Sequence, residues 1–260
     1  MRDAPRPSNA PFVVRPSWRL FAAFALAVPA VTFCHEFGHH LVAALECGGV
    51  GRVVFTQFQE RDGCQAIVGN ISGPVISFVI MWLGVWLMAR AGWRMVGFAL
   101  LVGSIPILRV FSVMSGGDDW NYTGYLLRGN RYVAPLTALV LALVVPALVI
   151  AWRRVRMARQ WLLFPATLVL PMIPAMLLLQ QLDQRIYMPY VKHPERFTGA
   201  TALGAPVGVL AVYGAFLALY AAWGHGVLRA ADAAAPASGD TEGDTEGDAA
   251  GASASLRVTA

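Results

Sequence analysis

Charged residues are scarce in this chain. Lysine, arginine, aspartate and glutamate make up 13% of its 260 residues, whereas soluble proteins have about 25%. Hydrophobic residues make up 57%, and the mean hydropathy is +0.56. This composition excludes an ordinary soluble protein and predicts one that lies in a lipid bilayer. The net charge of +5 is spread over short loops, so it predicts orientation in the membrane and not binding to nucleic acid.

The chain also lacks a polar segment between its apolar stretches that is long enough to form a soluble domain. A helix needs about 20 apolar residues to cross a hydrocarbon core of about 30 Å, and six stretches meet this length. We therefore expect an all-α membrane protein with six transmembrane helices and a small β-hairpin between the first and second. The expected spans are 18–46, 71–89, 93–115, 132–152, 160–181 and 200–223.

These spans divide the chain into four parts. Residues 1–17 form an N-terminal arm, and 18–128 form a three-span membrane core that contains the hairpin near 52–68 and a Gly-Gly-Asp-Asp turn. Residues 129–229 add three further spans. Residues 230–260 contain a tandem TEGD repeat without apolar periodicity, which predicts a disordered tail.

The N-terminus allows two interpretations. Four arginines, an apolar stretch and "VPA" ending at Ala30 are together typical of a secretory signal peptide. However, the apolar run continues without a break through Leu41, so we expect a true membrane span.

The first span contains "HEFGHH" at 35–40. A charged residue at the centre of a membrane helix costs roughly 2.5 to 3.5 kcal/mol, so such residues usually have a function there. His35 and His39 are four residues apart and lie on one helix face, about 40° apart, where both imidazoles can bind one metal ion. HExxH is the zinc-binding pattern in which the glutamate, here Glu36, activates water. A polar packing cluster is the alternative. His40 lies on a different face, and we expect it to pack or to form a hydrogen bond.

A catalytic zinc ion needs a third protein ligand, and "MSGGDDWN" at 114–121 offers Asp118 or Asp119. Either aspartate is also a good helix N-cap. If the spans alternate in direction, both aspartates, "GNISGP" at 69–74 and loop 182–199 reach the same side of the membrane as the histidines. His193 and His225 are expected to lie away from the metal, and Arg109, inside the third span, to face protein or water.

"HEFGH" at 35–39, "SGPVIS" at 72–77 and "GGDD" at 116–119 resemble motifs of the site-2 protease family of intramembrane zinc metalloproteases. The resemblance covers the first half of the chain. It implies one Zn²⁺ per chain and hydrolysis of membrane-protein or membrane-bound peptide substrates. Ser77 stands where the family usually has asparagine, and no glycine follows either aspartate, unlike the family's Leu-Asp-Gly turn.

Substrate contacts are expected from Asn70, Gly73 and Ser77. Asn70 and Gly73 could bind a peptide backbone or an oxyanion, although "NISGP" equally predicts a helix start with proline in the first turn. Two β-favouring runs flank "RDG" at 61–63, which predicts a hairpin whose edge could pair with an extended substrate, or which merely caps the helices.

A second function is a metal-binding or catalytically inactive membrane scaffold or transport component derived from such a protease. The single lysine against nineteen arginines, with abundant alanine, is typical of a GC-rich bacterial genome, so we expect a multi-pass protein of a bacterial inner membrane. Orientation is open. Counts of arginine and lysine, ten against seven, favour an N-terminus inside the cytoplasm and would permit a Cys47–Cys64 disulfide outside it. The family resemblance favours a site nearer the cytoplasm.

Overall fold

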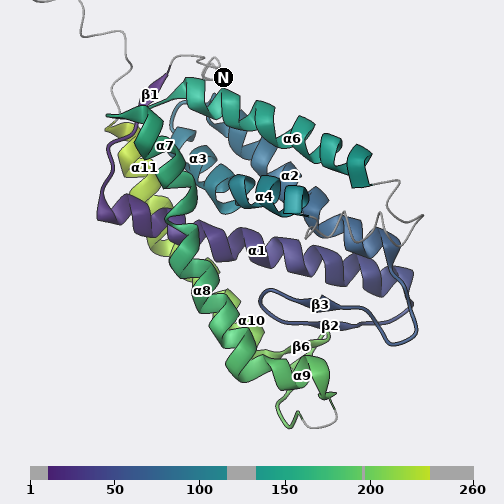
Figure 1. Ribbon diagram of the computed structural model, residues 1–260. Coiled ribbons are helices and arrows are strands. Elements are labelled where there is room, and N and C mark those ends of the chain that lie inside the picture. The colour runs from purple at the N-terminus through teal and green to yellow at the C-terminus, as the bar shows by residue number, and fades with distance from the viewer. Residues whose placement is uncertain (1–10, 116–132, 195–196, 235–260) are drawn as a thin grey trace, which may run out of the picture.

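A computed structural model describes residues 11–115, 133–194 and 197–234. Six helical segments are long and apolar enough to cross a membrane, and a small antiparallel strand pair lies between the first two (Figure 1). This confirms the predicted class of an all-α membrane protein with six spans and one such hairpin. The spans are Trp18–Glu46, Ile67–Leu87, Arg94–Ser115, Ala134–Arg154, Gln160–Arg185 and Val207–Ala233.

Several spans consist of more than one helical element, and three short strand pairs connect or flank them. The helices are α1 (Trp18–Glu46), α2 (Ile67–Leu87), α3 (Arg94–Gly103), α4 (Pro106–Ser115), α6 (Val133–Arg154), α7 (Gln160–Val169), α8 (Met172–Leu182), α9 (Met188–Lys192), α10 (Val207–Leu219) and α11 (His225–Ala233), with π-helical turns η2 (Asp183–Tyr187) and η4 (Tyr220–Gly224). The strands are β1 (Phe12–Val13) parallel to β4 (Val155–Arg156), β2 (Arg52–Val53) antiparallel to β3 (Phe58–Gln59), and β5 (Thr201–Ala202) antiparallel to β6 (Ala205–Pro206).

Helices α1 and α2 pack closely because glycines line their contact. Gly69 and Gly73 form a GxxxG spacing on α2, which lets two membrane helices approach. A Cβ added at Gly69 would lie 2.6 Å from the Ala43 Cβ atom, and one added at Gly38 would overlap the Ile76 side chain. The backbone of α2 is therefore within reach of side chains on α1.

Helix α2 begins at Ile67, four residues before the expected start of the second span. The carboxylate of Glu46, in the last turn of α1, accepts hydrogen bonds from the backbone N–H groups of Ile67 (3.1 Å) and Gly69 (3.0 Å). Two of the unpaired donors of the first turn are thus satisfied by another helix. Pro74 consequently lies inside α2, so the prediction that it occupies the first turn is wrong.

The hairpin forms, but its expected turn is wrong. β2 and β3 are joined through residues 54–57, where the Val54 N–H donates to the Gln57 carbonyl at 2.9 Å. Arg61 and Gly63 belong to a separate turn closed by a bond from the Cys64 N–H to the Arg61 carbonyl (3.0 Å). "RDG" at 61–63 therefore forms a tight turn, as predicted, but this turn follows both strands and does not connect them.

The third and sixth spans also differ from expectation. The third is broken at residues 104–105, between α3 and α4, where Ile105 has a φ of 47°. The sixth begins at Val207 and not at 200, because residues 201–206 form β5 and β6. It continues to Ala233, past the expected end at 223.

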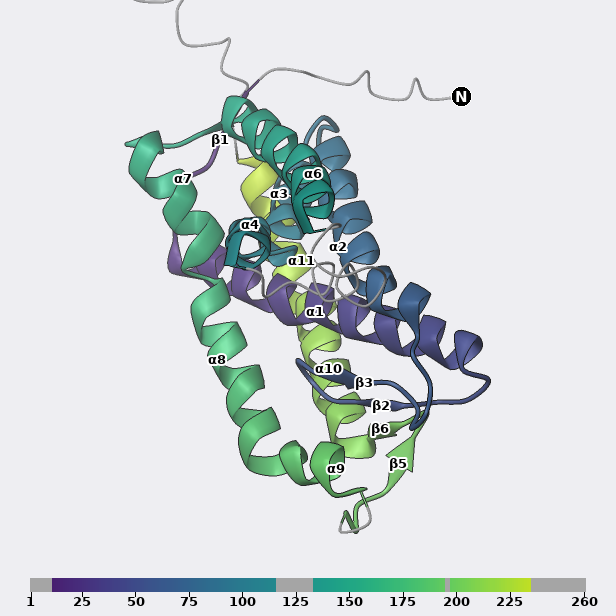
Figure 2. The same ribbon diagram turned by 45° about the vertical axis from the view of Figure 1, so that its right-hand side comes forward.

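The fifth and sixth spans pack on the same central helix, α1, as the second and third, whereas α6 of the fourth span packs on α4 and α2. α2 and α3 contact one part of α1, while α8, α10 and η4 contact others. Figures 1 and 2 show the β2–β3 hairpin beside the C-terminal half of α1, between that helix and the segment containing β6 and α9. The hairpin is therefore held between the two halves of the chain.

Candidate metal centre

The two histidines of the HExxH pattern converge on one point. His35 and His39 are both buried in α1, and their Nε2 atoms lie 3.1 Å apart. Two nitrogens that bind one tetrahedral zinc at about 2.0–2.1 Å would be about 3.3 Å apart. The spacing on the helix thus gives two nitrogens the separation that a shared metal ion requires.

The ring of His39 is oriented by α2 and by the hairpin. Its Nδ1 lies 2.8 Å from the Gly69 carbonyl oxygen, which can only accept, so Nδ1 carries the hydrogen and Nε2 has the free electron pair. Phe58 of β3 stacks on the ring, with centroids 5.7 Å apart. A Cβ added at Gly73 would overlap the other side of the ring, coming within 2.7 Å of Cε1. His39 is thereby fixed in a tautomer suited to metal binding through Nε2.

The ring of His35 contacts one residue of α2 through Nδ1 and one residue of α4 through both of its nitrogens. The Ser77 hydroxyl, which is 2% exposed, lies 3.0 Å away. The Nη2 atom of Arg109, from α4, lies 2.9 Å from Nδ1 and 3.3 Å from Nε2. Arg109 therefore faces protein inside the third span, as predicted, and its partner is the first histidine of the motif.

Glu36 lies where two cavities meet. One cavity of about 590 Å³ is lined by Glu36, His39, Asn70 and the hairpin segment 56–64. A second cavity of about 200 Å³ is lined by Glu36, His35, Ser77, Arg109 and other residues of α1, α4 and α8. Glu36 and Thr56 belong to both linings. The carboxylate is buried within the protein but borders space that water or a substrate can fill.

The three expected substrate contacts lie around this site. Gly73 packs against the His39 ring, and Ser77 bonds to His35. Asn70 lines the larger cavity, and its Nδ2 donates to the Glu60 carboxylate at 2.6 Å. Gly73 and Ser77 thus contact the histidines directly, and Asn70 connects α2 to the loop after the hairpin.

The aspartates expected as third ligand, Asp118 and Asp119, lie outside the described residues. Within the described ranges, no group of three His, Cys, Asp or Glu residues is arranged to hold a metal. His40 instead bonds through Nε2 to the Leu203 carbonyl, and His225 packs beside Trp93, with ring centroids 5.9 Å apart.

Comparisons with other proteins add no relative. No protein-family model matches the chain, and neither a curated protein nor a solved structure matches it.

Asp183 is the main site-forming residue that the sequence analysis missed. Its carboxylate, 2% exposed, accepts hydrogen bonds from the Phe55 N–H (2.9 Å), the Thr56 N–H (2.7 Å) and the Thr56 hydroxyl (2.6 Å). The Tyr213 hydroxyl donates to the Phe55 carbonyl at 2.6 Å. Spans five and six therefore hold the hairpin turn beside Glu36. An aspartate at the end of a long apolar stretch was the available signal.

We expect Asp183→Asn to destabilise the protein by about 1–3 kcal/mol, because its amide group would face donors of the hairpin turn that the carboxylate now satisfies. Thermal unfolding in detergent measures this. The control is Asp62→Asn, since Asp62 is 77% exposed and pairs with Arg52 at 2.6 Å. Exposed pairs of this kind contribute about 0–1 kcal/mol. An equal decrease in unfolding temperature in the two variants would show that the buried hydrogen bonds of Asp183 stabilise the protein no more than an exposed ion pair does.

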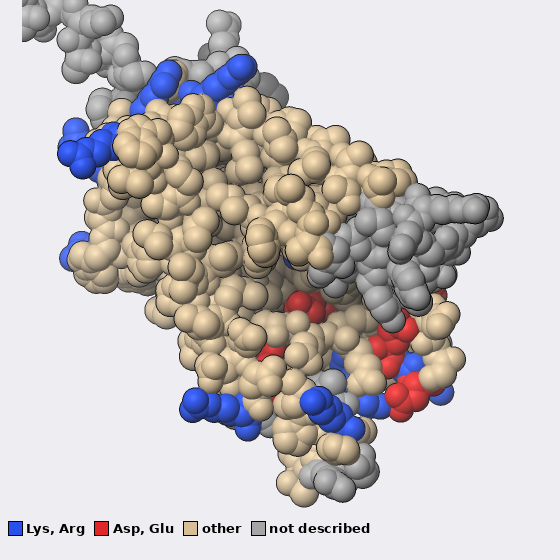
Figure 3. Space-filling view, viewed as in Figure 1, with Lys and Arg blue, Asp and Glu red and all other residues tan. Residues whose placement is uncertain are grey.

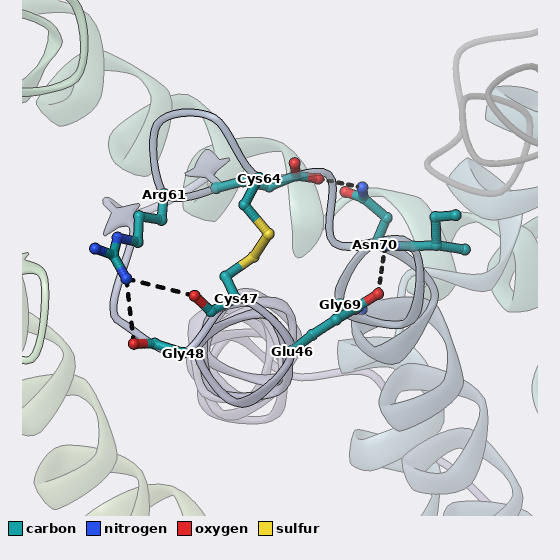
Figure 4. Close-up of a disulfide and its surroundings, with 9 residues drawn as sticks. Glu46, Cys47, Gly48, Arg61, Cys64, Gly69 and Asn70 are labelled. Carbon is teal, nitrogen blue, oxygen red and sulfur yellow. Dashed lines mark hydrogen bonds between the residues drawn. A yellow bond between two sulfur atoms is a disulfide. The ribbon is translucent and has the colours of Figure 1, made fainter.

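The cavity wall beyond the hairpin is tied to the end of α1. Cys47 and Cys64 form a disulfide with Cα atoms 5.9 Å apart. Arg61 donates to the carbonyls of Cys47 (3.4 Å) and Gly48 (3.2 Å) (Figure 4). Figure 3 shows acidic side chains gathered in and beside the hollow at the hairpin end of this face, and basic side chains at both ends of the molecule.

Proposed function

We propose that the chain is a zinc-dependent intramembrane endopeptidase that hydrolyses peptide bonds of membrane-associated substrates. One observation carries the proposal. The His35 and His39 Nε2 atoms lie 3.1 Å apart, both Nδ1 atoms have hydrogen-bond partners, and Glu36 lies between them in sequence at the junction of two cavities. A hydrogen bond between the two rings would give a packing cluster the same convergence, but such a cluster has no need for the two cavities that border Glu36.

His35, His39 and one of Asp118 or Asp119 would hold the metal, one ion per chain. Zinc, when bound, supplies a Lewis acid that polarises water and the substrate carbonyl. Glu36 takes the proton of the attacking water on its carboxylate and gives it to the departing amine. The burial of Glu36 limits competing solvent, while the larger cavity supplies water at a depth where lipid would otherwise exclude it.

The hairpin gives a route for positioning the substrate. β2 pairs with β3 on one side, and its Val53 N–H donates to the Gly204 carbonyl at 3.1 Å on the other. Both residues of β3, with Gln57 before them, line the larger cavity. An extended substrate segment that pairs with β3 would run past Glu36 and His39.

The proposed location is a bacterial inner membrane, with the site opening on the non-cytoplasmic side. Two observations support this orientation. Cys47 and Cys64 form a disulfide beside the larger cavity, and disulfides persist in oxidising compartments. The distribution of arginine and lysine, ten against seven, also favours a cytoplasmic N-terminus.

The metal content of the purified, zinc-reconstituted protein tests the proposal. We expect one zinc per chain in the wild type, lost in His39→Ala and in one of Asp118→Ala and Asp119→Ala. An inactive metal-binding scaffold would also hold zinc, so hydrolysis must be measured beside it. A wild-type protein that holds no zinc would overturn the proposal.

A further inference from the structure

An apolar groove lies between the start of α1 and α7, and the proposed reaction does not use it. Its volume is about 130 Å³, and its walls come from the N-terminal arm, from α1 and from α7. Phe21 of α1 and Leu170, just after α7, both line it and are 40% and 50% exposed. The groove therefore opens on the surface of two membrane spans, where a hydrocarbon chain can enter it.

Two exposed tryptophans place the mouth of the groove at the membrane surface. Trp18 is the first residue of α1 and Trp161 the second residue of α7, and they are 71% and 72% exposed. Tryptophan is enriched at the membrane–water interface, where its ring lies at the level of the lipid headgroups. From these first turns the lining continues to Phe24 in α1 and to Leu170. The groove thus extends from the headgroup region into the hydrocarbon.

The parallel strands β1 and β4 bring two arginines to this mouth. Val13 pairs with Arg156, and the Val14 N–H donates to the Arg156 carbonyl at 2.8 Å. Val14 is 2% exposed and lines the groove, whereas Arg15 and Arg156 are exposed. The pairing fixes the N-terminal arm against the connection between the fourth and fifth spans (Figure 1). Arg15 and Arg156 are therefore held near each other although 140 residues separate them.

Two further arginines belong to the first turns of the helices that form the groove. Arg19 is the second residue of α1, and Arg159 is the N-cap of α7. The Leu163 N–H donates to the Arg159 carbonyl at 3.1 Å, so Arg159 lies one turn before a residue that lines the groove. Both arginines are exposed. The arginine cluster of the groove mouth thus consists of Arg15, Arg19, Arg156 and Arg159.

Within the part of the chain that the structure describes, no acidic side chain neutralises the arginine cluster. None of its members forms an ion pair there, and neither α1 nor α7 has an acidic residue in its first turn. Asp232 lies at the same end of the molecule, but it is 8% exposed and accepts a hydrogen bond from the Arg94 N–H (3.2 Å). Uncompensated guanidinium groups beside an apolar groove fit a lipid with an anionic headgroup.

We propose that the groove and the arginine cluster bind one anionic phospholipid. Its phosphate accepts hydrogen bonds from the arginines, whose planar groups match phosphate oxygens, and one acyl chain lies in the groove between α1 and α7. Six spans place both termini on one side of the membrane, so the acidic segment 240–248 is the competing partner. That segment has no apolar side chain for the groove, which favours the lipid. The inference is independent of the metal site.

Lipid binding to the purified full-length protein in a mild detergent tests the site. The probes are a phosphatidylglycerol and a phosphatidylcholine with the same chains and the same fluorophore. An arginine near an anionic headgroup strengthens binding by about fivefold. We expect wild type to prefer phosphatidylglycerol by at least about 25-fold, and the double variant Arg15→Gln/Arg159→Gln to bind it about 25-fold more weakly. Binding of phosphatidylcholine should stay within about twofold of wild type.

The matched control is Arg90→Gln/Arg229→Gln, which removes two charges at the same end of the molecule. The Arg90 and Arg229 guanidinium carbons lie 4.6 and 4.7 Å from the ring centroids of Trp86 and Trp93, and neither arginine lines the groove. Arginines gather at the cytoplasmic ends of spans for orientation alone, so this control separates general charge from a site. It should bind phosphatidylglycerol within about twofold of wild type. An equal loss in the two double variants would overturn the site.

Filling the groove tests the position of the acyl chain. Ala166 lines the groove, so Ala166→Phe should weaken the binding of both lipids at least about fivefold. Ala138→Phe adds the same side chain on an exposed face of α6 and should leave binding unchanged. Unchanged binding in Ala166→Phe would show that no chain lies in the groove, and the proposal would be wrong. If thermal unfolding shows that Ala166→Phe does not fold, Ala166→Leu takes its place.

A variant with amides in place of the acidic side chains of segment 240–248 tests the competing partner. It should bind both lipids as wild type does. A preference for phosphatidylglycerol that is absent in wild type and appears in this variant would assign the arginine cluster to the segment and overturn the lipid site. The residues changed are Asp240, Glu242, Asp244, Glu246 and Asp248.

Discussion

Glu36→Gln should abolish proteolysis while the protein retains its zinc. An amide cannot take a proton from water, and a general base contributes about 10²- to 10⁴-fold to the rate. We therefore expect cleavage of β-casein by the reconstituted protein to fall by at least about 100-fold, followed by gel and mass spectrometry. Zinc content should remain near one per chain, because His35 and His39 keep their ring geometry.

The matched control is Asp232→Asn, which also replaces a buried carboxylate by an amide. Asp232 lies near the C-terminal end of α11. Its carboxylate accepts a hydrogen bond from the backbone N–H of Arg94, the first residue of α3, at 3.2 Å. Neither residue lines the two cavities that border Glu36. Loss of the Asp232 carboxylate should affect stability but not the chemical step. Full activity in Glu36→Gln with zinc bound would remove Glu36 from the mechanism. Loss of zinc together with activity would instead give Glu36 a role in holding the metal.

Gly73→Ala should disrupt zinc binding although it adds one methyl group on a neighbouring helix. A Cβ at this position would overlap the imidazole ring of His39 and push its Nε2 away from that of His35. Overpacking of this kind costs about 1–3 kcal/mol. We expect zinc affinity to fall at least about tenfold and the unfolding temperature to decrease, measured by chelator competition and by thermal unfolding.

The comparison for this variant is Gly214→Ala in α10, where an added Cβ meets no atom within 4 Å. Alanine stabilises a helix by roughly 0.5–1 kcal/mol relative to glycine, so this variant should be neutral or slightly more stable. A decrease in stability in Gly73→Ala would therefore come from the overlap with His39 and not from helix propensity. Normal zinc affinity in Gly73→Ala would mean that the His39 ring does not hold the proposed metal.

The spans were predictable because apolar length is a local property. The start of α2 was not, since the group that caps it is the Glu46 carboxylate, 21 and 23 residues before the N–H groups that it satisfies. The hairpin turn likewise depends on Asp183, 128 residues after Phe55. "RDG" is the stronger local turn signal, but a buried carboxylate with three hydrogen bonds determines where the strands pair.

The convergence of His35 and His39 followed from helical spacing, and Arg109 was expected to face protein. What surrounds them could not be read locally. Helical periodicity places Ser77 and Gly73 on a face of α2, but it does not predict that Ser77 contacts His35 or that Gly73 contacts His39. Their contacts arise because Gly38, Gly69 and Gly73 let the backbones of α1 and α2 approach closely. The assignment of Asp118 or Asp119 remains a prediction, because both lie outside the described residues.

The anchoring of the hairpin has a consequence for the order in which the protein is made. The hairpin is synthesised between the first and second spans, but its turn is held by Asp183 of the fifth and by Tyr213 of the sixth. Residues 35–39 emerge from the ribosome long before either of these. During membrane insertion the nascent chain therefore carries its histidines and the hairpin before the turn of the hairpin has its anchors. If the chain is the protease proposed above, the site would be unable to hold a substrate until the last span is in place.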